Sequence, residues 1–336
     1  MAFALRLLCC LSVGIMQPPL LLCAVATITL RNNKARMPKR LLQNIRTVIH
    51  NVADLNRSKQ AWADITGFSI IDEGTLPESL CAAWNAPAAA GSPYVLFATG
   101  NKEPFHLRLV ETGNTLPFGS PMHYGWMANE LLAEDVDELT PRLHDSEFTV
   151  IGGPHDLFPR AKAPRAVQTT GPDGELVYFT RIIAGGTVNA LKPAESYVDR
   201  SFNLIAAGPD IELMRQFYED TLGQRMNAPI VFRIPYLAAA CGVTPDTPFH
   251  IQVAKIGTRR SIIELDQLPG NASPRPQGDG ELPPGIAMVG FNVSDLDALP
   301  VAPRAAPAAV DCAPYNGARV AVIEGPAGEW LELIEE

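Results

Sequence analysis

The chain has 336 residues, of which 47% are hydrophobic and 19% are charged, and its formal net charge is −9. This composition is typical of a globular protein long enough for two domains, and it excludes a disordered chain. The negative charge, with no Lys/Arg run, zinc-ligand spacing or phosphate-binding glycine loop, argues against a nucleic-acid partner.

The chain begins with an apolar segment, residues 2–30, that carries a single charge at Arg6. This segment admits three interpretations: a signal peptide, a membrane anchor interrupted by Pro18 and Pro19, or extra sequence ahead of a start at Met37. We favour the third, which makes the protein cytoplasmic; export is the alternative if residues 1–26 are a signal peptide. In each case residues 1–36 lie outside the fold, whose folded part is not expected to insert into a membrane.

Residues 46–68 predict the first strand and helix of the fold. Side chains alternate from residue 46 to residue 52 as in a strand, and Asp54 is a good N-cap for the helix that follows. Ser58, Ala61, Trp62 and Ile65 recur at helical spacing, and Gly67 ends the helix. A strand at 68–74, a short helix at 77–85 and strands at 92–100 and 103–111 complete this first module, residues 44–112.

The same pattern returns three times along the chain. The second module, residues 122–183, has a strand at 125–133, a helix after Asp135 and closing strands at 165–170 and 174–182. A linker follows at 184–200. The third module, residues 201–268, has its capping residue at Asp210, and a fourth module, residues 285–336, has Asp295 at the same place, although Pro300 and Pro303 weaken the helix there. Such an internal repeat determines the architecture.

The repeated pattern resembles the vicinal oxygen chelate superfamily, which holds glyoxalase I, the bleomycin-resistance proteins and the extradiol dioxygenases. The resemblance rests on the strand–helix start V-x-D-L-x-x-S at 52–58 and on the closing strands GPDGELVYF at 171–179 and GPAGEWLEL at 325–333. It implies an α+β fold of four βαβββ modules, paired into two domains with a cup on the concave face of each sheet. We expect residues 37–183 to form the first domain and residues 201–336 the second.

The resemblance also implies where a divalent metal would bind, on the first and last strands of paired modules. In the first domain these positions hold Thr47, Arg108, Ala128 and Tyr178, none of which is a ligand of the expected His or Glu kind, so no cofactor is expected there. In the second domain they hold Asn203, Glu264, Met288 and Glu332. A weaker alternative is a divalent-metal site formed by Glu264, Glu332 and His250.

Without a metal, side chains on the strands must supply the chemistry. Alternation places His106 on the same face as Arg108, and the pairing of modules one and two would bring Tyr178 and Glu130 to the same cup. Arg108 can hold a carboxylate or an oxyanion, His106 can move a proton, Tyr178 can donate a hydrogen bond, and Glu130 can act as a base. Further residues are expected to bind the substrate in this cup: Thr47, Asn51, Tyr94 and Trp126.

Three hypotheses about function follow. The first is a metal-independent lyase, isomerase or hydrolase that acts on a small anionic or aromatic molecule in the first-domain cup. The second is a non-catalytic binding or sequestering protein of the bleomycin-resistance kind, and the third is the metal enzyme that uses Glu264 and Glu332. All three have a small-molecule ligand, and a homodimer is compatible with each of them.

Overall fold

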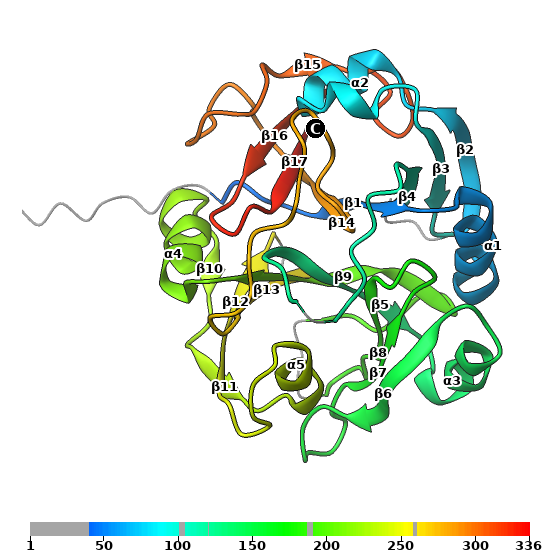
Figure 1. Cartoon of the computed structure of the whole chain (residues 1–336), viewed down its shortest axis with the longest axis vertical. Coiled ribbons are helices and arrows are strands. Elements are labelled where there is room, and N and C mark those ends of the chain that lie inside the picture. The colour runs from blue at the N-terminus through cyan, green and yellow to red at the C-terminus, as the bar shows by residue number, and fades with distance from the viewer. Residues whose placement is uncertain (1–39, 101–104, 120, 187–190, 258–260) are drawn as a thin grey trace, which may run out of the picture. The chain divides into compact units, whose positions relative to one another are not determined.

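The computed structural model describes residues 40–100, 105–119, 121–186, 191–257 and 261–336, and residues Met37–Glu336 form one compact unit (Figure 1). The interpretations of the N-terminal segment, residues 1–36, therefore lie outside the described residues. The first module contains β1 (Ile45–Val52), α1 (Leu55–Thr66), β2 (Ser69–Thr75), α2 (Glu78–Trp84), the 3-10 turn η1 (Pro87–Ala89), β3 (Pro93–Ala98) and β4 (His106–Glu111). As predicted, the Asp54 side chain caps α1 by accepting from the Arg57 amide, and Gly67 ends it with a φ of 69°.

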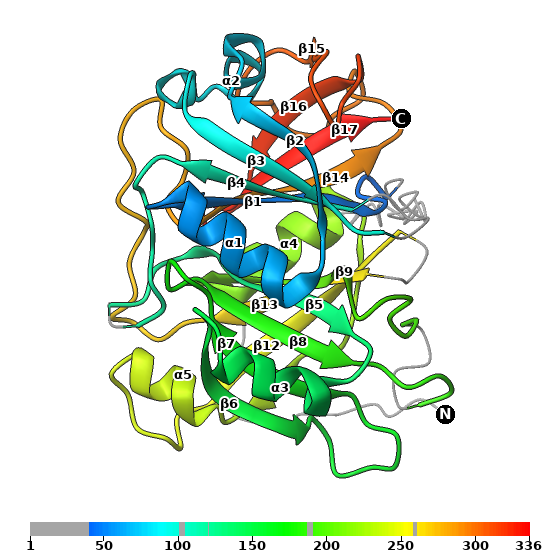
Figure 2. The same cartoon turned by 90° about the vertical axis from the view of Figure 1, so that its right-hand side faces the viewer.

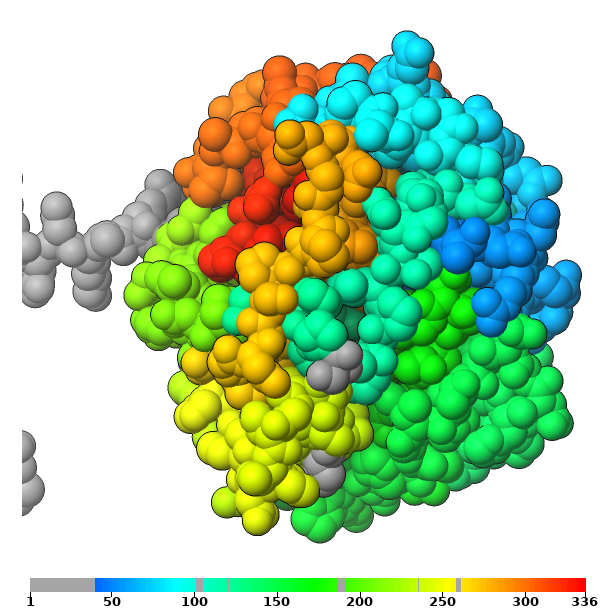
Figure 3. Space-filling view, in the orientation of Figure 1, coloured from blue at the N-terminus to red at the C-terminus, as the bar shows by residue number. Residues whose placement is uncertain are grey.

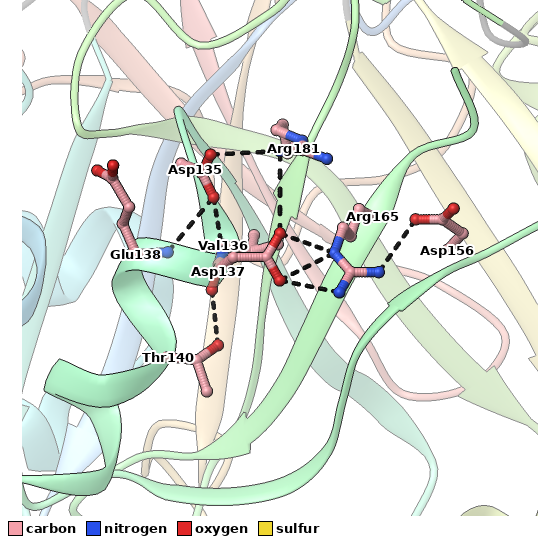
Figure 4. Close-up of polar contacts among 8 residues, drawn as sticks. All are labelled: Asp135, Val136, Asp137, Glu138, Thr140, Asp156, Arg165 and Arg181. Atoms are coloured by element: carbon pink, nitrogen blue, oxygen red, sulfur yellow. Dashed lines mark hydrogen bonds and ion pairs between the residues drawn. The ribbon is translucent and has the colours of Figure 1, made fainter. Parts of the chain in front are cut away.

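The second module contains β5 (Gly125–Ala133), α3 (Val136–His144), β6 (Thr149–Asp156), β7 (Arg165–Thr170) and β8 (Leu176–Arg181). Asp135 caps α3, and the next acidic residue, Asp137, binds Arg165 of β7 through both carboxylate oxygens (Figure 4). Arg165 also reaches Asp156 of β6, and Arg181 of β8 reaches Asp135. These ion pairs join the start of the helix to the three strands beneath it.

The third module contains β9 (Val198–Gly208), α4 (Ile211–Gln216), the π-helical turn η2 (Phe217–Thr221), β10 (Arg225–Met226), β11 (Ile230–Phe232), α5 (Pro235–Ala240), β12 (Phe249–Ile256) and β13 (Ser261–Gln267). The fourth contains β14 (Ile286–Val293), β15 (Ala308–Ala309), β16 (Arg319–Glu324) and β17 (Trp330–Glu335). Asp295 begins no helix in the described residues 294–304, where Pro300 and Pro303 remove the backbone donors that a helix needs. The α+β class and the four repeated modules are confirmed.

The pairing of the modules differs from our expectation. One sheet has the order β15-β16-β17-β14-β1-β4-β3-β2, which joins modules four and one, and the other has the order β10-β12-β13-β9-β5-β8-β7-β6, which joins modules three and two. The expected domains, residues 37–183 and 201–336, are therefore wrong as units of sheet pairing. In both sheets the first strands of two modules pair antiparallel, β1 with β14 and β5 with β9. All four modules present the same kind of first-strand edge, so the repeat itself does not specify which two copies meet.

The two sheets share one hydrophobic core on the sides that face each other. Figure 2 shows α1 and α4 between the two sheets, where Trp62 and Met214 join buried side chains of both sheets in a single cluster. The Trp62 indole donates to Glu175 of module two at 3.2 Å, and the Tyr218 hydroxyl donates to Glu329 of module four at 3.0 Å. The core thus joins module one to module two and module three to module four, while the sheets join module one to module four and module two to module three.

A long loop, residues 268–285, connects the two sheets along the surface (Figure 3, gold). Its Arg275 guanidinium donates to four backbone oxygens, of Tyr124, Trp126, Pro284 and Ile286. Burial lowers the pKa of Arg275 to about 10. This one side chain holds the start of β5 against the start of β14. Within the described part of the chain, no helix is both long and apolar enough to cross a membrane.

Candidate active site

The concave face of the nine-stranded sheet holds the open cup of the molecule. Two adjoining cavities lie on it, of about 400 and 370 Å³. They share two acidic residues, Glu130 and Glu264, and four apolar ones, Leu157, Phe158, Phe232 and Ile251. An apolar cavity with a few convergent polar groups is the usual form of a small-molecule site.

Three neighbouring strands supply the floor of this cup. Glu130 of β5 lies opposite Asn203 of β9, and Glu264 lies on β13, which pairs with the other edge of β9. The Asn203 amide donates to Glu130 at 2.7 Å and approaches Glu264 at 3.5 Å, and Thr180 of β8 donates to the other oxygen of Glu130. Two donors therefore hold Glu130 in place, whereas Glu264 is half-buried and faces the cavity.

Glu264 has a second acidic neighbour on its own strand. Asp266 lies two residues further along β13, on the same face, and its carboxyl group hydrogen-bonds that of Glu264. Burial first, and then the negative charge of Glu130, raise the pKa of Glu264 to about 7, while burial and Glu264 raise the pKa of Asp266 well above its usual range. Two carboxyl groups this close cannot both ionise readily, so the pair holds a proton near neutral pH.

Two tyrosines lie at one side of the same cavity. The Tyr178 hydroxyl of β8 and the Tyr236 hydroxyl of α5 are 2.7 Å apart, so one donates to the other. Burial raises the pKa of both hydroxyls, which keeps them protonated at neutral pH. One O–H of the pair remains free to donate to a bound oxygen atom.

The cup of the eight-stranded sheet is filled by the chain itself. Helix α2 and residues 308–316 pack into it, with Leu80, Trp84, Val310 and Tyr315 in one buried cluster. At its centre the fully buried Glu332 accepts hydrogen bonds from Thr47 at 2.8 Å, Trp84 at 2.7 Å and Tyr315 at 2.6 Å.

Arg108 faces Glu332 in this filled cup as its counter-charge, and the two are linked through the Tyr315 hydroxyl and not by a direct ion pair. Its guanidinium donates to the Tyr315 hydroxyl at 3.1 Å and to the Ala313 carbonyl at 2.6 Å, and the side chain is only 1% exposed. The rings of Trp84, Tyr94 and Tyr315 lie 5.1–5.7 Å from it. Apart from the Arg108 Nε, which is buried without a partner, the polar groups of this network are paired within the protein, which is the pattern of a structural charge network.

The structure separates the four residues predicted to be catalytic. His106 and Arg108 lie on β4 in the filled cup, whereas Glu130 and Tyr178 lie in the open cup of the other sheet. Burial lowers the pKa of His106 to about 4, so its imidazole is neutral at pH 7. The expected single cup with all four residues is therefore wrong, because it assumed that β4 and β8 belong to one sheet.

The residues predicted to bind substrate have internal partners instead. Thr47 donates to Glu332, Asn51 to the Pro283 carbonyl, Trp126 to the Trp330 carbonyl and Tyr94 to Asp72. None of the four lines the two cavities of the open cup. For Thr47, Asn51 and Tyr94 the predicted role depended on the same incorrect pairing of modules. Trp126 does belong to the nine-stranded sheet, but a register shift between Trp126 and Ala128 places its side chain in the core shared by the two sheets.

The alternative metal site is also divided. Glu332 lies in the eight-stranded sheet, Glu264 lies in the nine-stranded sheet, and the His250 side chain is exposed on β12. Within the described ranges, no three His, Cys, Asp or Glu side chains are grouped so that they could hold a metal ion. In the open cup, the space between Glu130 and Glu264 receives the N–H of Asn203, which is a donor and cannot ligate a cation. The residues present therefore do not fit the metal that the resemblance implies.

Three residues of the open cup were missed by the sequence analysis: Thr180, Tyr236 and Asp266. Thr180 and Asp266 each follow a recognised cup position by two residues, so strand alternation alone was enough to find them. Tyr236 lies on the short helix α5, which the sequence offered no reason to place over β8.

Comparisons with solved structures agree with this architecture. Glyoxalase I from Zea mays matches with a TM-score of 0.57 at 14% identity, over 87% of this chain and 92% of that one. A putative dioxygenase from Bacillus subtilis matches with a TM-score of 0.57 at 10% identity, over 88% of this chain and 86% of the other. No family model and no curated sequence matches the chain. The resemblance to the vicinal oxygen chelate superfamily is thus confirmed at the level of the fold, and this chain is a four-module protein with that fold.

Proposed function

We propose that this protein is an acid–base enzyme that acts on a small molecule with an apolar or aromatic body, bound in the cup of the nine-stranded sheet. One observation carries the proposal. The Glu264 carboxyl faces an apolar cavity while it is hydrogen-bonded to Asp266 and lies beside Glu130. Carboxyl groups with a pKa near neutrality in a closed site are suited to proton transfer.

The residues of the floor have separate roles in such a reaction. Glu264 takes a proton from the substrate, and its hydrogen bond to Asp266 keeps the carboxyl oriented. Burial raises the pKa of Glu130, and the hydrogen bonds that it accepts from Thr180 and Asn203 oppose that rise. The Tyr178–Tyr236 pair donates a hydrogen bond to the oxygen on which negative charge develops. Proton transfer at a carbon next to a carbonyl group needs this combination of one base and one neutral donor.

The proposal changes the expected substrate in one respect. The sequence predicts an anionic or aromatic molecule. The anionic alternative rests on Arg108, whose guanidinium is enclosed in the other sheet by Tyr315 and Ala313. The open cup presents acidic groups at its floor and apolar side chains on its walls. These surroundings favour an uncharged or positively charged molecule and disfavour a carboxylate.

Proton–deuterium exchange tests this function without knowledge of the natural substrate. An uncharged phenyl-substituted ketone, 1-phenylpropan-2-one, is incubated with the protein in D₂O, and the signals of the protons next to its carbonyl are followed by NMR. We expect exchange faster than in buffer, and a loss of about 100-fold or more in Glu264→Gln, as is common for a missing general base. The exposed Glu138 of α3 supplies the matched control, Glu138→Gln, which should retain the full rate.

Two further observations complete the test. The exchange rate should rise with pH through an apparent pKa near 7, as Glu264 ionises, and a chelator should leave it unchanged. Exchange no faster than in buffer, or equal exchange in Glu264→Gln, would overturn the proposal. A ligand that binds in the cup without any exchange would favour the binding protein of the bleomycin-resistance kind instead.

A further inference from the structure

We propose that the molecule bound in the open cup carries an ammonium-type cation, which lies against Glu130 and Glu264 while its apolar body contacts the walls. This inference deepens the proposed function, on which it rests for the identity of the site. It names the chemical class of the substrate: an amine with an aromatic or aliphatic body. Three observations lead to it.

The first observation is a charge imbalance at the floor. Two acidic side chains line it, Glu130 and Glu264, with Asp266 beside Glu264 on β13, and none of the three forms an ion pair with a basic side chain of the described residues. The basic residues that line the cavities are Lys255, which is half-buried, and Arg233 and His155, which are exposed. Since Glu130 is 6% exposed, its charge has little water to solvate it, and a cation from the ligand would compensate for that.

The second observation is a set of buried acceptors without donors. The side-chain oxygen of Asn203 has no hydrogen-bond partner, and neither does that of Gln168, although both residues line the cavities and are at most 5% exposed. The orientation of the Asn203 amide follows from its neighbours, because its nitrogen donates to Glu130 and its oxygen is then left over. One carboxylate oxygen of Asp266 is also unpaired. These oxygens add partial negative charge to that of the carboxyl groups, so the floor favours a donor-rich, positive group.

The third observation is the apolar lining above this floor. Phe158, Phe232 and Ile251 border both cavities, and Ile205 and Ile262 extend the apolar surface into one cavity each. Burial of a phenyl-sized body on such walls adds affinity, while the acidic floor selects the head group. A carboxylate head would meet like charges, and a hydroxyl head would leave the net charge of the floor uncompensated.

The experiment compares three probes with the same body: 2-phenylethylamine, 2-phenylethanol and 3-phenylpropanoate. Binding to the full chain is measured by calorimetry at pH 7, with ligand-observed NMR for weak cases. We expect the amine to bind at least about tenfold tighter than the alcohol, as a charge-assisted contact provides, and the carboxylate not to bind. Binding of the cation should also release protons, because it lowers the pKa of Glu264, and heats measured in buffers of different ionisation enthalpy will show this release.

Variants assign the preference to the floor. Glu130→Gln and Glu264→Gln should each reduce the amine-over-alcohol preference by about tenfold, whereas Glu138→Gln should leave it unchanged. Circular dichroism shows whether each variant is folded, and if one is not, the ranking of the three probes on the unmodified protein still decides. An amine that binds no tighter than the alcohol, or an unchanged preference in both folded variants, would overturn the inference.

The outcomes separate this inference from the proposed function. The exchange test uses an uncharged ketone, so exchange without an amine preference would refute only the cationic substrate. An amine preference without ketone exchange would refute only the acid–base role of Glu264. Both results are obtained from the same protein preparations.

Discussion

Replacement of Arg108 by methionine tests whether the charge pair of the filled cup is structural. The substitution keeps a long side chain but removes the hydrogen bonds to Tyr315 and Ala313 and the charge that faces Glu332. Glu332, with no exposed surface, would then be a buried carboxylate without a counter-charge. We expect the free energy of unfolding to fall substantially, while exchange in the open cup continues.

The magnitude follows from what each partner loses. Removal of one member of a buried charge pair costs about 3–5 kcal/mol, because the other is left uncompensated. Glu332→Gln should cost a similar amount, since it leaves Arg108 buried without a counter-charge. The double variant Arg108→Met/Glu332→Gln leaves no charge unpaired, so its cost should be smaller than the sum of the two single costs by about 1–3 kcal/mol.

Guanidinium unfolding followed by far-ultraviolet circular dichroism measures these costs. The control is Arg57→Met, which breaks the exposed ion pair with Glu147 and should cost less than about 1 kcal/mol. Single costs below about 1 kcal/mol, or strictly additive costs, would refute the structural interpretation of this network. A loss of exchange activity in folded Arg108→Met would return Arg108 to the catalytic role that the sequence suggested.

Three other predictions concern the core. Burial raises the pKa of Glu175 from 4.5 to about 8, so the folded state keeps a proton that the unfolded state has lost, and the free energy of unfolding should fall as pH rises from about 4.5 to 8. In Glu175→Gln the free energy of unfolding should depend less steeply on pH across this range. An equally steep dependence would contradict the assignment. Tyr218→Phe removes the hydrogen bond to Glu329 and should lower the free energy of chemical unfolding by about 1–3 kcal/mol, because an acceptor is left unpaired in the core. An unchanged free energy of unfolding would show that this contact between modules is not needed for stability. Gly290→Ala would place a Cβ 2.0 Å from the Thr47 hydroxyl oxygen, which should lower the free energy of unfolding by about 1–3 kcal/mol and lower the melting temperature. An unchanged melting temperature would mean that the side chains of the filled cup can move to accommodate the methyl group.

Much of the fold was predictable from the sequence because its causes are local. Asp54, Asp135 and Asp210 accept hydrogen bonds from the first amides of their helices, and this depends only on residues two or three positions away. The superfamily resemblance likewise placed Glu264 at a cup-facing position of its strand without knowledge of its neighbours. The repeat then indicated the superfamily fold, since four copies of one strand–helix pattern occur in order.

The site was only partly predictable, because it depends on which copies pair. Tyr178 and Glu130 do share a cup, but Arg108 is in the other sheet, since module one pairs with module four. Every module presents a similar first-strand edge, and the backbone hydrogen bonds across such an edge are the same whichever module supplies it. Side-chain contacts between distant residues distinguish the partners, such as those that Thr47 and Trp84 of module one form with Glu332 of module four.

The sequence by itself therefore determined the modules, their helix caps and the alternation of side chains along the strands. Only the tertiary structure decided which cup is open. Helix α2 and residues 308–316 fill one cup with apolar side chains around Arg108 and Glu332, while α5 lies at the side of the other and leaves Glu264 facing a cavity. The physical reason is that filling a cavity depends on how side chains from several elements fit together in space, and no local pattern records that fit.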